Sequence, residues 1–330
     1  MRPRRSRCSS QRVRIHSVSL NARDLQICSG TYPAPVLPPV GLVPCSDGAG
    51  EVLAVGSGVR EFSAGDRVVT HLSEAWQHGE LGNEMQETAL GGGRDGVLRK
   101  VVVLNEQSLL PIPDGMSYAE ASCLPVAGLT AYHCLFGFER TLQPGQTLLV
   151  EGTGGVSMAA LQLALSVGAR PIVLSSSDDK LRKCVELGVA EGDCINYRST
   201  PEWHTRVREL APRGVDHTIE IGGRDTIIKA IQSTAPYGSV WVVGYMSDYA
   251  EPTAPGELDV AKAILYSQAV VRGVLCGSRA LFRTYLAAHA ARPEALRPLI
   301  ECSFPFAEAH AAFQHLRKGA MGKVVIRCSD

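Results

Sequence analysis

The chain has 330 residues, of which 45% are hydrophobic and 20% charged, a balance typical of a globular protein with a sizeable core. Lys and Arg together equal Asp and Glu at 33 each, so no net charge draws the chain to nucleic acid or to an anionic membrane. The sequence has neither an apolar secretory signal nor an uninterrupted apolar run of about 18 residues, which a membrane span requires. We therefore expect a cytoplasmic protein without nucleic-acid or membrane partners.

The N-terminus is rich in arginine. One interpretation is a mitochondrial transit segment, which is Arg- and Ser-rich and poor in acids, and the other is a disordered tail or an altered start of the chain. No amphipathic helical stripe is visible, which favours the second interpretation. Seven arginines precede the first acidic residue, Asp24: Arg2, Arg4, Arg5, Arg7, Arg12, Arg14 and Arg23.

The ten cysteines are scattered along the chain. None forms a CxxC pair, and no Cys–His cluster has the spacing of a zinc finger. We expect most of them to be buried thiols in a reducing compartment.

In chain order, residues 13–120 predict a compact β-rich domain. Short β-like runs occur at residues 13–15, 50–55 and 67–70, and turn-forming residues occur at 64–66 and 111–115. The polar, Gly-rich segment 77–96 is expected to be a long surface loop.

Between residues 123 and 279 the pattern changes to alternating strands and helices, which predicts an α/β fold with a doubly wound parallel sheet. The helix after the first strand carries a buried face from Val156 to Val167 and ends at a capping Gly168. Ser177 or Asp178 is expected to cap the next helix. The strands are expected at residues 147–150, 171–174, 194–196, 215–219, 240–243 and 269–275.

From about residue 280 the chain is expected to be helical until a final strand at 323–327. The predicted domains are therefore residues 1–122, residues 123–279 and a C-terminal return over residues 280–330.

A glycine cluster follows the first strand of the α/β region and opens its helix. Glycine permits a tight turn and close approach of the backbone to a pyrophosphate, and the helix N-terminus supplies free N–H groups. This context favours a dinucleotide site over a structural turn without a ligand. Ser157 takes the place of the last glycine of the fingerprint and is still small. The predicted cofactor-binding residues here are Gly152, Thr153, Gly154, Gly155 and Val156.

The end of the second strand indicates which dinucleotide binds. About twenty residues after the glycines, NAD-binding proteins usually place an acid that holds the ribose hydroxyls. Here the residues are Ser175, Ser176 and Ser177, and Lys180 follows as a partner for a 2′-phosphate. Asp178–Asp179 lie nearby and count against this interpretation. We predict NADP(H) rather than NAD.

Seven motifs in one order resemble the zinc-independent alcohol dehydrogenase and quinone oxidoreductase branch of the medium-chain dehydrogenase/reductase superfamily. The resemblance covers about residues 13–327. It implies a GroES-like catalytic domain, built from both chain ends around a Rossmann domain, with the active site in the cleft between them. Family members usually begin with a β-hairpin, which the Arg-rich segment replaces here, so part of the catalytic domain is expected to be uncovered. The motifs are at residues 21–24, 46–52, 65–68, 127–132, 144–145, 152–157 and 322–326.

The resemblance also bears on zinc. The positions that match the catalytic-zinc ligands of zinc-dependent relatives are Asn21, Ser46 and Ala127, which are poor ligands or none. Residues 70–100 contain no cysteine, so the structural zinc lobe is missing too. The pairs His71/His78 and His310/His315 are explained as ordinary core or solvated histidines. We predict no metal.

The predicted absence of a catalytic zinc indicates which type of reaction the chain catalyses. Zinc stabilises an alkoxide as a Lewis acid, whereas an enolate formed from a conjugated carbonyl is delocalised and needs only hydrogen-bond donors. We therefore predict NADPH-dependent reduction of an enone or quinone, in detoxification or specialised metabolism. Two alternatives remain open: a metal-free alcohol dehydrogenase, and a non-catalytic NADP-binding protein.

The resemblance implies further site residues. Asn21, Tyr32 and Thr130 are the expected catalytic residues, and Asp24 is expected to position the turn that carries Asn21. A homodimer is expected through the last Rossmann strand, residues 270–276. The other residues expected around the cofactor or the substrate are Tyr197, Gly244, Tyr245, Gly277, Ser278, Arg279 and Lys323.

Overall fold

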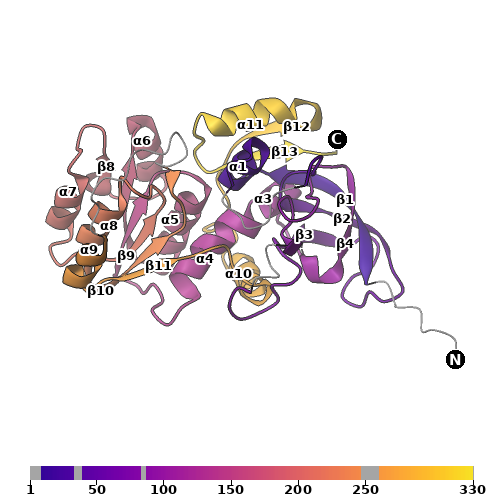
Figure 1. Ribbon diagram of the computed structural model, residues 1–330, viewed down its shortest axis with the longest axis horizontal. Helices are drawn as coiled ribbons and strands as arrows, with labels where there is room; N and C mark the ends of the chain where they lie inside the picture. Colours follow the sequence, from indigo (N-terminus) through magenta and orange to yellow (C-terminus); the bar gives the residue numbers. More distant parts are fainter. Residues whose placement is uncertain (1–8, 33–38, 83–86, 247–259, 330) are drawn as a thin grey trace. The chain divides into compact units, whose positions relative to one another are not determined.

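The computed structural model describes residues 9–32, 39–82, 87–246 and 260–329 (Figure 1). The chain divides into two compact units. Unit 1 consists of Met1–Leu129 and Cys276–Asp330, and unit 2 of Thr130–Leu275. The first eight residues, which carry most of the N-terminal arginines, lie outside the described part. Arg12 and Arg14 belong to the first strand, where both are exposed.

Unit 1 is built on a seven-stranded sheet in the order β12-β13-β1-β2-β3-β5, with β4 also paired to β1. In β1 the exposed arginines alternate with the buried Val13 and Ile15, as expected for a strand that covers a core with one face. The strands are β1 (Ser10–Ser19), β2 (Asp47–Val55), β3 (Arg67–Thr70), β4 (Val101–Asn105), β5 (Leu109–Pro111), β12 (Ile300–Pro305) and β13 (Lys323–Arg327).

The helices of unit 1 complete its core. Val324 and Ile326 of β13 belong to a buried cluster against which Phe313 and Leu316 of α11 pack. Figure 1 shows α11 running alongside β12 and β13. The helical segments are α1 (Ala22–Ser29), η1 (Glu106–Ser108), α3 (Tyr118–Ser122), the π-helical turn η2 (Leu124–Gly128), α10 (Arg279–Ala291), η5 (Phe306–Glu308) and α11 (Ala309–Arg317).

Two sequence-based expectations for unit 1 were wrong. The region after residue 280 is not helical throughout, because β12 pairs in parallel with β13. Its half-buried Ile300, Cys302 and Phe304 alternate with exposed residues, a period of two that marks a strand. The segment 77–96 is not entirely a surface loop either, because Leu90 is buried in the core cluster.

Unit 2 is a six-stranded sheet in the order β11-β10-β9-β6-β7-β8, and every pairing is parallel. This order confirms the predicted doubly wound sheet. The chain builds outward from β6 in one direction and then returns to build outward from β9 in the other. The strands are β6 (Thr147–Glu151), β7 (Arg170–Ser175), β8 (Cys194–Asn196), β9 (Val215–Glu220), β10 (Thr234–Val242) and β11 (Val270–Gly273).

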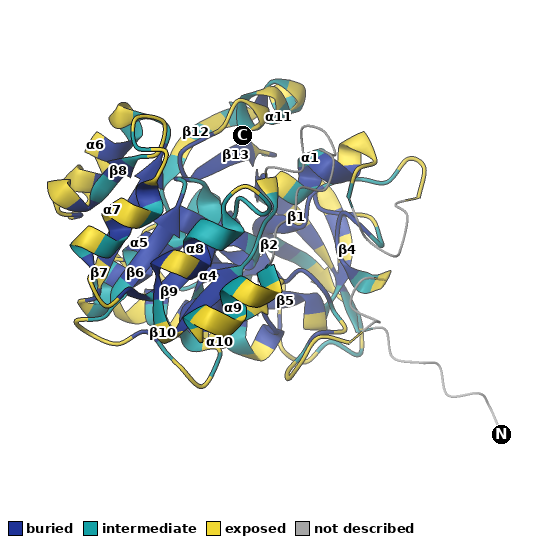
Figure 2. Ribbon diagram, turned by 60° about the vertical axis from the view of Figure 1, so that its left-hand side comes forward, coloured by how far each residue is buried: buried dark blue, intermediate teal, exposed yellow. Residues whose placement is uncertain are grey.

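Helices enclose this sheet, so its central strands are buried while the outward faces of the helices are exposed (Figure 2). Both predicted caps are present: Gly168 ends α5 with φ 78°, and the Ser177 hydroxyl accepts a hydrogen bond from Lys180 N. No helix in the described ranges is long and apolar enough to span a membrane. The helices are α4 (Leu129–Phe136), which begins at the boundary between the units, α5 (Gly155–Val167), α6 (Asp178–Glu186), η3 (Glu191–Asp193), α7 (Trp203–Leu210), α8 (Ile227–Ser233) and α9 (Val260–Ser267).

Candidate active site and cofactor cradle

The point where the winding of unit 2 reverses lies between β6 and β9. In doubly wound sheets, ligands bind beyond the carboxyl ends of the strands at this point, because the two connections leave in opposite directions. Gly152 follows β6 with φ 69°, and a Cβ added there would lie 2.9 Å from Ile221 Cδ1. A Cβ on Gly244, after β10, would lie 2.9 Å from Ile221 O. Because Gly152 and Gly244 have no Cβ, the ends of β6 and β10 can approach Ile221, which follows β9.

The glycine turn leads directly into α5. Gly154 is the N-cap residue, and a Cβ built on it would meet no described atom within 4 Å. The first-turn N–H groups of a helix lack partners within the helix, so this open side is suited to an anion. Ser157 turns away from it, because its hydroxyl donates to Glu151 O at 2.7 Å. Thr153 is 5% exposed, and Gly155 and Val156 are half-buried.

A pair of buried carboxyl groups, which was not predicted from the sequence, lies at the same strand ends. Glu220 accepts hydrogen bonds from Gly222 N at 3.1 Å and Gly223 N at 2.7 Å, and Glu151 accepts from Ile221 N at 3.3 Å. Burial, and then the neighbouring Glu220, raise the pKa of Glu151 well above its usual value. Burial likewise raises the pKa of Glu220. Each glutamate is the last residue of its strand, β6 or β9, but only the order of the folded sheet places these two strands side by side.

The second strand of the predicted fingerprint, β7, ends at a group of serines. Ser175 is 3% exposed, its hydroxyl accepts from Ser177 N at 3.3 Å, and its carbonyl accepts from Tyr197 N at 3.1 Å. The Tyr197 backbone thus lies beside the end of β7, while its side chain is exposed. Ser176 is half-buried. Three predicted residues therefore lie together here.

Lys180 lies in the first turn of α6, and its backbone N donates to the Ser177 hydroxyl at 3.4 Å. The two aspartates beside it have partners of their own. Asp178 accepts from Asn196 Nδ2 at 2.7 Å, and Asp179 pairs with Arg182.

In unit 1, two predicted residues from opposite ends of the chain are in direct contact. Lys323 Nζ donates to Asn21 Oδ1 at 2.6 Å and to Leu20 O at 2.8 Å. Lys323 is only 5% exposed. Because Oδ1 faces the ammonium group, the orientation of the Asn21 amide is determined, and Nδ2 is directed elsewhere. Nδ2 is buried and has no hydrogen-bond partner among the described atoms.

Asp24 holds the turn that presents Asn21. Its carboxylate accepts from Asn21 N at 2.8 Å across the first turn of α1. Burial raises the pKa of Asp24 to about 6, although Arg23 at 3.7 Å opposes this shift. Asp24 therefore contributes to the backbone geometry of the turn.

The other two positions that match zinc ligands lie in a hydrogen-bond network around Asp47. Ser46 Oγ donates to Asp47 Oδ1 at 2.6 Å, and Val126 N donates to Asp47 Oδ2 at 3.1 Å. Asp47 is fully buried, and its Oδ2 lies 4.0 Å from Lys323 Nζ. Ala127 is 4% exposed and follows Val126 in η2. Asp47, which no sequence motif marks as functional, joins these positions to the lysine.

Two further residues, Tyr32 and Thr130, were predicted to be catalytic. Tyr32 is half-buried, with the Arg23 guanidinium 5.6 Å from its ring centroid. Thr130 is 5% exposed in α4, at the start of unit 2.

Gly277 and Ser278 lie in unit 1 rather than with the glycine turn in unit 2. The Gly277 carbonyl lies 2.8 Å from Nε2 of the buried His71, and burial lowers the pKa of that histidine. Ser278 caps α10 by accepting from Leu281 N at 3.2 Å. Both residues thus have structural partners within unit 1.

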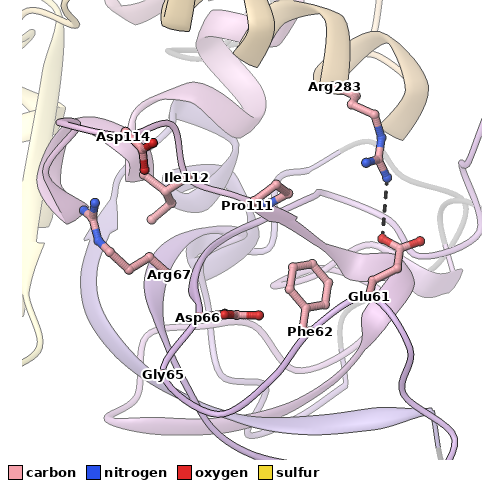
Figure 3. A pocket seen from close by; sticks show the side chains of 9 residues that line it. All are labelled: Glu61, Phe62, Gly65, Asp66, Arg67, Pro111, Ile112, Asp114 and Arg283. Carbon is pink, nitrogen blue, oxygen red and sulfur yellow. Dashed lines mark hydrogen bonds and ion pairs between the residues drawn. The ribbon is translucent and has the colours of Figure 1, made fainter.

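Unit 1 also contains a cavity of about 470 Å³ below α10 (Figure 3). Charged side chains of both signs line it, and Arg283 and Glu61 pair with each other at 3.5 Å. None of the residues predicted for the site lines this cavity. We therefore do not assign the active site to it.

The sequence and the fold of this chain match known protein families. Residues 9–114 match the alcohol dehydrogenase GroES-like domain, and residues 155–291 match the zinc-binding dehydrogenase family. A zinc-type alcohol dehydrogenase-like protein of Schizosaccharomyces pombe is 38% identical over 96% of this chain and 90% of its own length. The chain belongs to the medium-chain dehydrogenase/reductase superfamily.

Other members of the superfamily agree with this assignment. A Pseudomonas aeruginosa quinone oxidoreductase is 34% identical over 69% of this chain and 62% of its own length. A candidate alcohol dehydrogenase of known structure from Sinorhizobium meliloti is 35% identical, with a TM-score of 0.86 over 99% of this chain and 93% of its own. A second solved structure, of an NAD-dependent alcohol dehydrogenase, is 30% identical, with a TM-score of 0.82 over 98% and 93% of the two chains. The chain is therefore an NAD(P)-dependent oxidoreductase.

Proposed function

We propose that this dehydrogenase reduces a conjugated carbonyl compound, an enone or a quinone, with NADPH and without a catalytic metal. The observation that carries the proposal is the Asn21 amide. Lys323 binds Oδ1 at 2.6 Å, and the buried Nδ2 has no partner among the described atoms. A buried donor without a partner costs free energy, so its retention favours an acceptor supplied by a ligand.

The nicotinamide supplies a hydride when it is bound, and the chain provides the surroundings for the charge that develops. Asn21 Nδ2 would donate to the oxygen of an enolate or hydroquinone anion, which is stronger than donation to the neutral carbonyl. Lys323 would orient that amide, and its ammonium group adds positive charge behind the donor. This arrangement suits a delocalised anion, which needs donors rather than a Lewis acid.

The zinc of the superfamily does not fit these residues. Asn21 Oδ1 is bound by an ammonium group, and the Ser46 hydroxyl donates to Asp47. Ala127 has no ligand atom. A divalent cation here would also lie close to the buried charge of Lys323, which repels it. We therefore derive no step through zinc at this position.

NADPH is proposed as the cofactor on the basis of the end of β7. Ser175 and Ser176 stand where a ribose-binding acid is usual, and Lys180 follows in the first turn of α6. The carboxylate of Asp178 is bound by Asn196, and Asp179 is paired with Arg182. These partners reduce the repulsion that a 2′-phosphate would meet. The solved alcohol dehydrogenase described as NAD-dependent keeps NADH as the alternative.

Alcohol oxidation is the second candidate, because the relatives described above include alcohol dehydrogenase-like proteins. One experiment separates the two candidates. The purified chain is assayed with NADPH against a panel of enones and quinones, and with NADP⁺ against simple alcohols, before and after treatment with a chelator. Chelator-resistant turnover of enones or quinones supports the proposal. Turnover restricted to alcohols would contradict it, and cofactor binding without any turnover would indicate a binding protein.

We also propose that the chain forms a homodimer through β11, the edge strand of the unit 2 sheet. Apolar side chains around this edge are exposed: Leu265 by 71%, Tyr266 by 77%, Val270 by 46% and Leu275 by 54%. An exposed strand edge with apolar neighbours is a surface that proteins usually cover. The mass in solution tests this, with Val270→Lys expected to give a monomer.

A further inference from the structure

Three side chains of different metal-ligating types meet at the β12 edge of the unit 1 sheet. Glu301 and Cys302 lie on β12, and His315 lies on α11. One ligand atom from each lies within 4.8 Å of the other two. In the described part of the chain, this is the one group of three or more His, Cys, Asp and Glu residues with such spacing. The sequence alone predicts only an ordinary histidine at His315.

An irregularity in β12 explains how consecutive residues reach one site. Side chains of neighbouring strand residues normally point to opposite faces. Here Ile300 pairs with Lys323 and Cys302 with Val324, so two steps on β12 match one step on β13. A bulge of this kind redirects a side chain, and bulges often lie beside functional sites. The bulge lies at Glu301, between the paired Ile300 and Cys302, so it can bring the Glu301 side chain toward that of Cys302.

The surrounding contacts hold two of the three side chains in place. Glu301 Oε2 lies 2.7 Å from His315 Nε2, and Glu301 Oε1 accepts from Met321 N at 3.0 Å. In known metal sites, a hydrogen bond to a ligating carboxylate, like the one from Met321 N, orients the ligand. The His315 ring also packs against Phe304, with the centroids 5.8 Å apart. The imidazole and the carboxylate are therefore ordered before any metal arrives.

The chemistry of the three ligands selects the metal. A thiolate and an imidazole favour Zn²⁺ and similar transition metals over Mg²⁺ or Ca²⁺, which prefer oxygen ligands. Burial and the neighbouring Glu301 raise the pKa of Cys302, so the free thiol keeps its proton at neutral pH. A bound metal would displace that proton.

The cluster lies on a different face of the sheet from the proposed catalytic groups. Val324 and Ile326 point into the core on which α11 packs. Lys323 precedes Val324 in the same strand, so its side chain alternates to the opposite face, where it meets Asn21. A metal on Cys302 and His315 would therefore have no part in hydride transfer.

We propose that Glu301, Cys302 and His315 form a binding site for one Zn²⁺ ion, with the fourth coordination position open to water. The site would join strand β12 to helix α11. It therefore stabilises the C-terminal part of unit 1 when the metal binds, because a ligand that binds only the folded chain raises its stability.

The test is titration of the full chain, previously treated with a chelator, with Co²⁺, which gives a thiolate-to-metal charge-transfer band in the near-ultraviolet only when thiolate sulfur is bound. We expect saturation at one equivalent, displacement of the band by Zn²⁺, and a higher melting temperature with Zn²⁺. Cys302→Ser should abolish the band, and His315→Gln should weaken Zn²⁺ binding about tenfold or more.

The chain offers matched controls: Cys28 is an exposed thiol elsewhere, and His310 is an exposed imidazole on the same helix. Cys28→Ser and His310→Gln should keep both the band and the affinity. Circular dichroism checks that each variant is folded. A band that survives Cys302→Ser, or a wild-type chain that binds no Zn²⁺ at micromolar concentration, would overturn the proposal. Neither outcome bears on NADPH turnover, so the two proposals fail independently.

Discussion

Lys323 and Asn21 are 302 positions apart in the sequence, yet the lysine Nζ donates to the asparagine Oδ1 at 2.6 Å in a buried network. Asp47 Oδ2 lies 4.0 Å from the same ammonium group, so the carboxylate partly compensates the positive charge of Lys323. The contact leaves Asn21 Nδ2 as the one amide atom of that side chain available to a ligand.

Replacing Asn21 should lower turnover more than it changes binding. Asn21→Ala removes the donor and is expected to lower kcat about 100-fold, the usual effect of losing one donor to a developing oxyanion. Asn21→Asp keeps the shape but offers only acceptors, so it should be at least as slow. The measurement is steady-state NADPH oxidation with the best enone or quinone. Asn105→Asp serves as a control, because the Asn105 side chain caps η1 by accepting from Gln107 N. Unchanged kcat in Asn21→Ala would contradict the role of the amide.

Gly154 tests the cofactor cradle. An added Cβ would meet no described atom within 4 Å, so Gly154→Ala should fold and lose only about 1 kcal/mol from the less favourable N-cap. The same methyl group would stand where a pyrophosphate approaches the helix, so we expect cofactor affinity to fall about tenfold or more. Fluorescence titration with NADPH measures it. Gly192→Ala, also free of neighbours within 4 Å, should bind normally. Equal affinities in the two variants would place the cofactor elsewhere.

Lys180 tests the choice between the two nicotinamide cofactors. Lys180→Met should raise the Kd for NADPH by roughly tenfold, the loss of one charge-assisted pair, and leave the Kd for NADH unchanged. Lys183 is exposed on the same helix, so Lys183→Met controls for the loss of a positive charge from α6. A wild-type chain that prefers NADH would refute the proposed role of Ser175 and Lys180 while leaving the enzyme class intact.

The buried pair Glu151 and Glu220 predicts a pH-dependent stability. Both pKa values are raised in the folded chain, chiefly by burial, above the usual value of 4.5. Their contribution to stability is therefore complete below about pH 4.5 and is lost as the pH rises through the folded pKa values. Glu151→Gln removes one of the two ionisable groups, so it should lose less stability than the wild type does as the pH rises above about 4.5.

Urea unfolding across that range measures the effect as the difference between variant and wild type. The difference is needed because buried histidines act in the opposite sense. His217 and His289, with pKa values lowered to about 4 by burial, destabilise the fold as the pH falls below 6.5. Glu186→Gln, at an exposed position of α6, should show the wild-type profile. A Glu151→Gln profile parallel to that of the wild type would show that the pair does not carry the effect.

The sequence by itself determined the features that depend on local order. The period of α5, its cap at Gly168 and the glycine turn after β6 were all predicted, because each depends on residues within a few positions of one another. The doubly wound sheet followed from the alternation of strands and helices, since parallel strands need crossover connections. The strand β13 was predicted at residues 323–327, the bounds that the structure has.

The tertiary structure decided what depends on pairing between distant segments. Nothing local to Asn21 shows that Lys323 will orient its amide, and nothing near Glu151 shows that Glu220 will be buried beside it. The approach of Glu301, Cys302 and His315 depends on a bulge that exists only when β12 pairs with β13. Whether a polar group is partnered, charged or left with a free atom is determined by which other segments exclude water from it, and the fold alone brings those segments together.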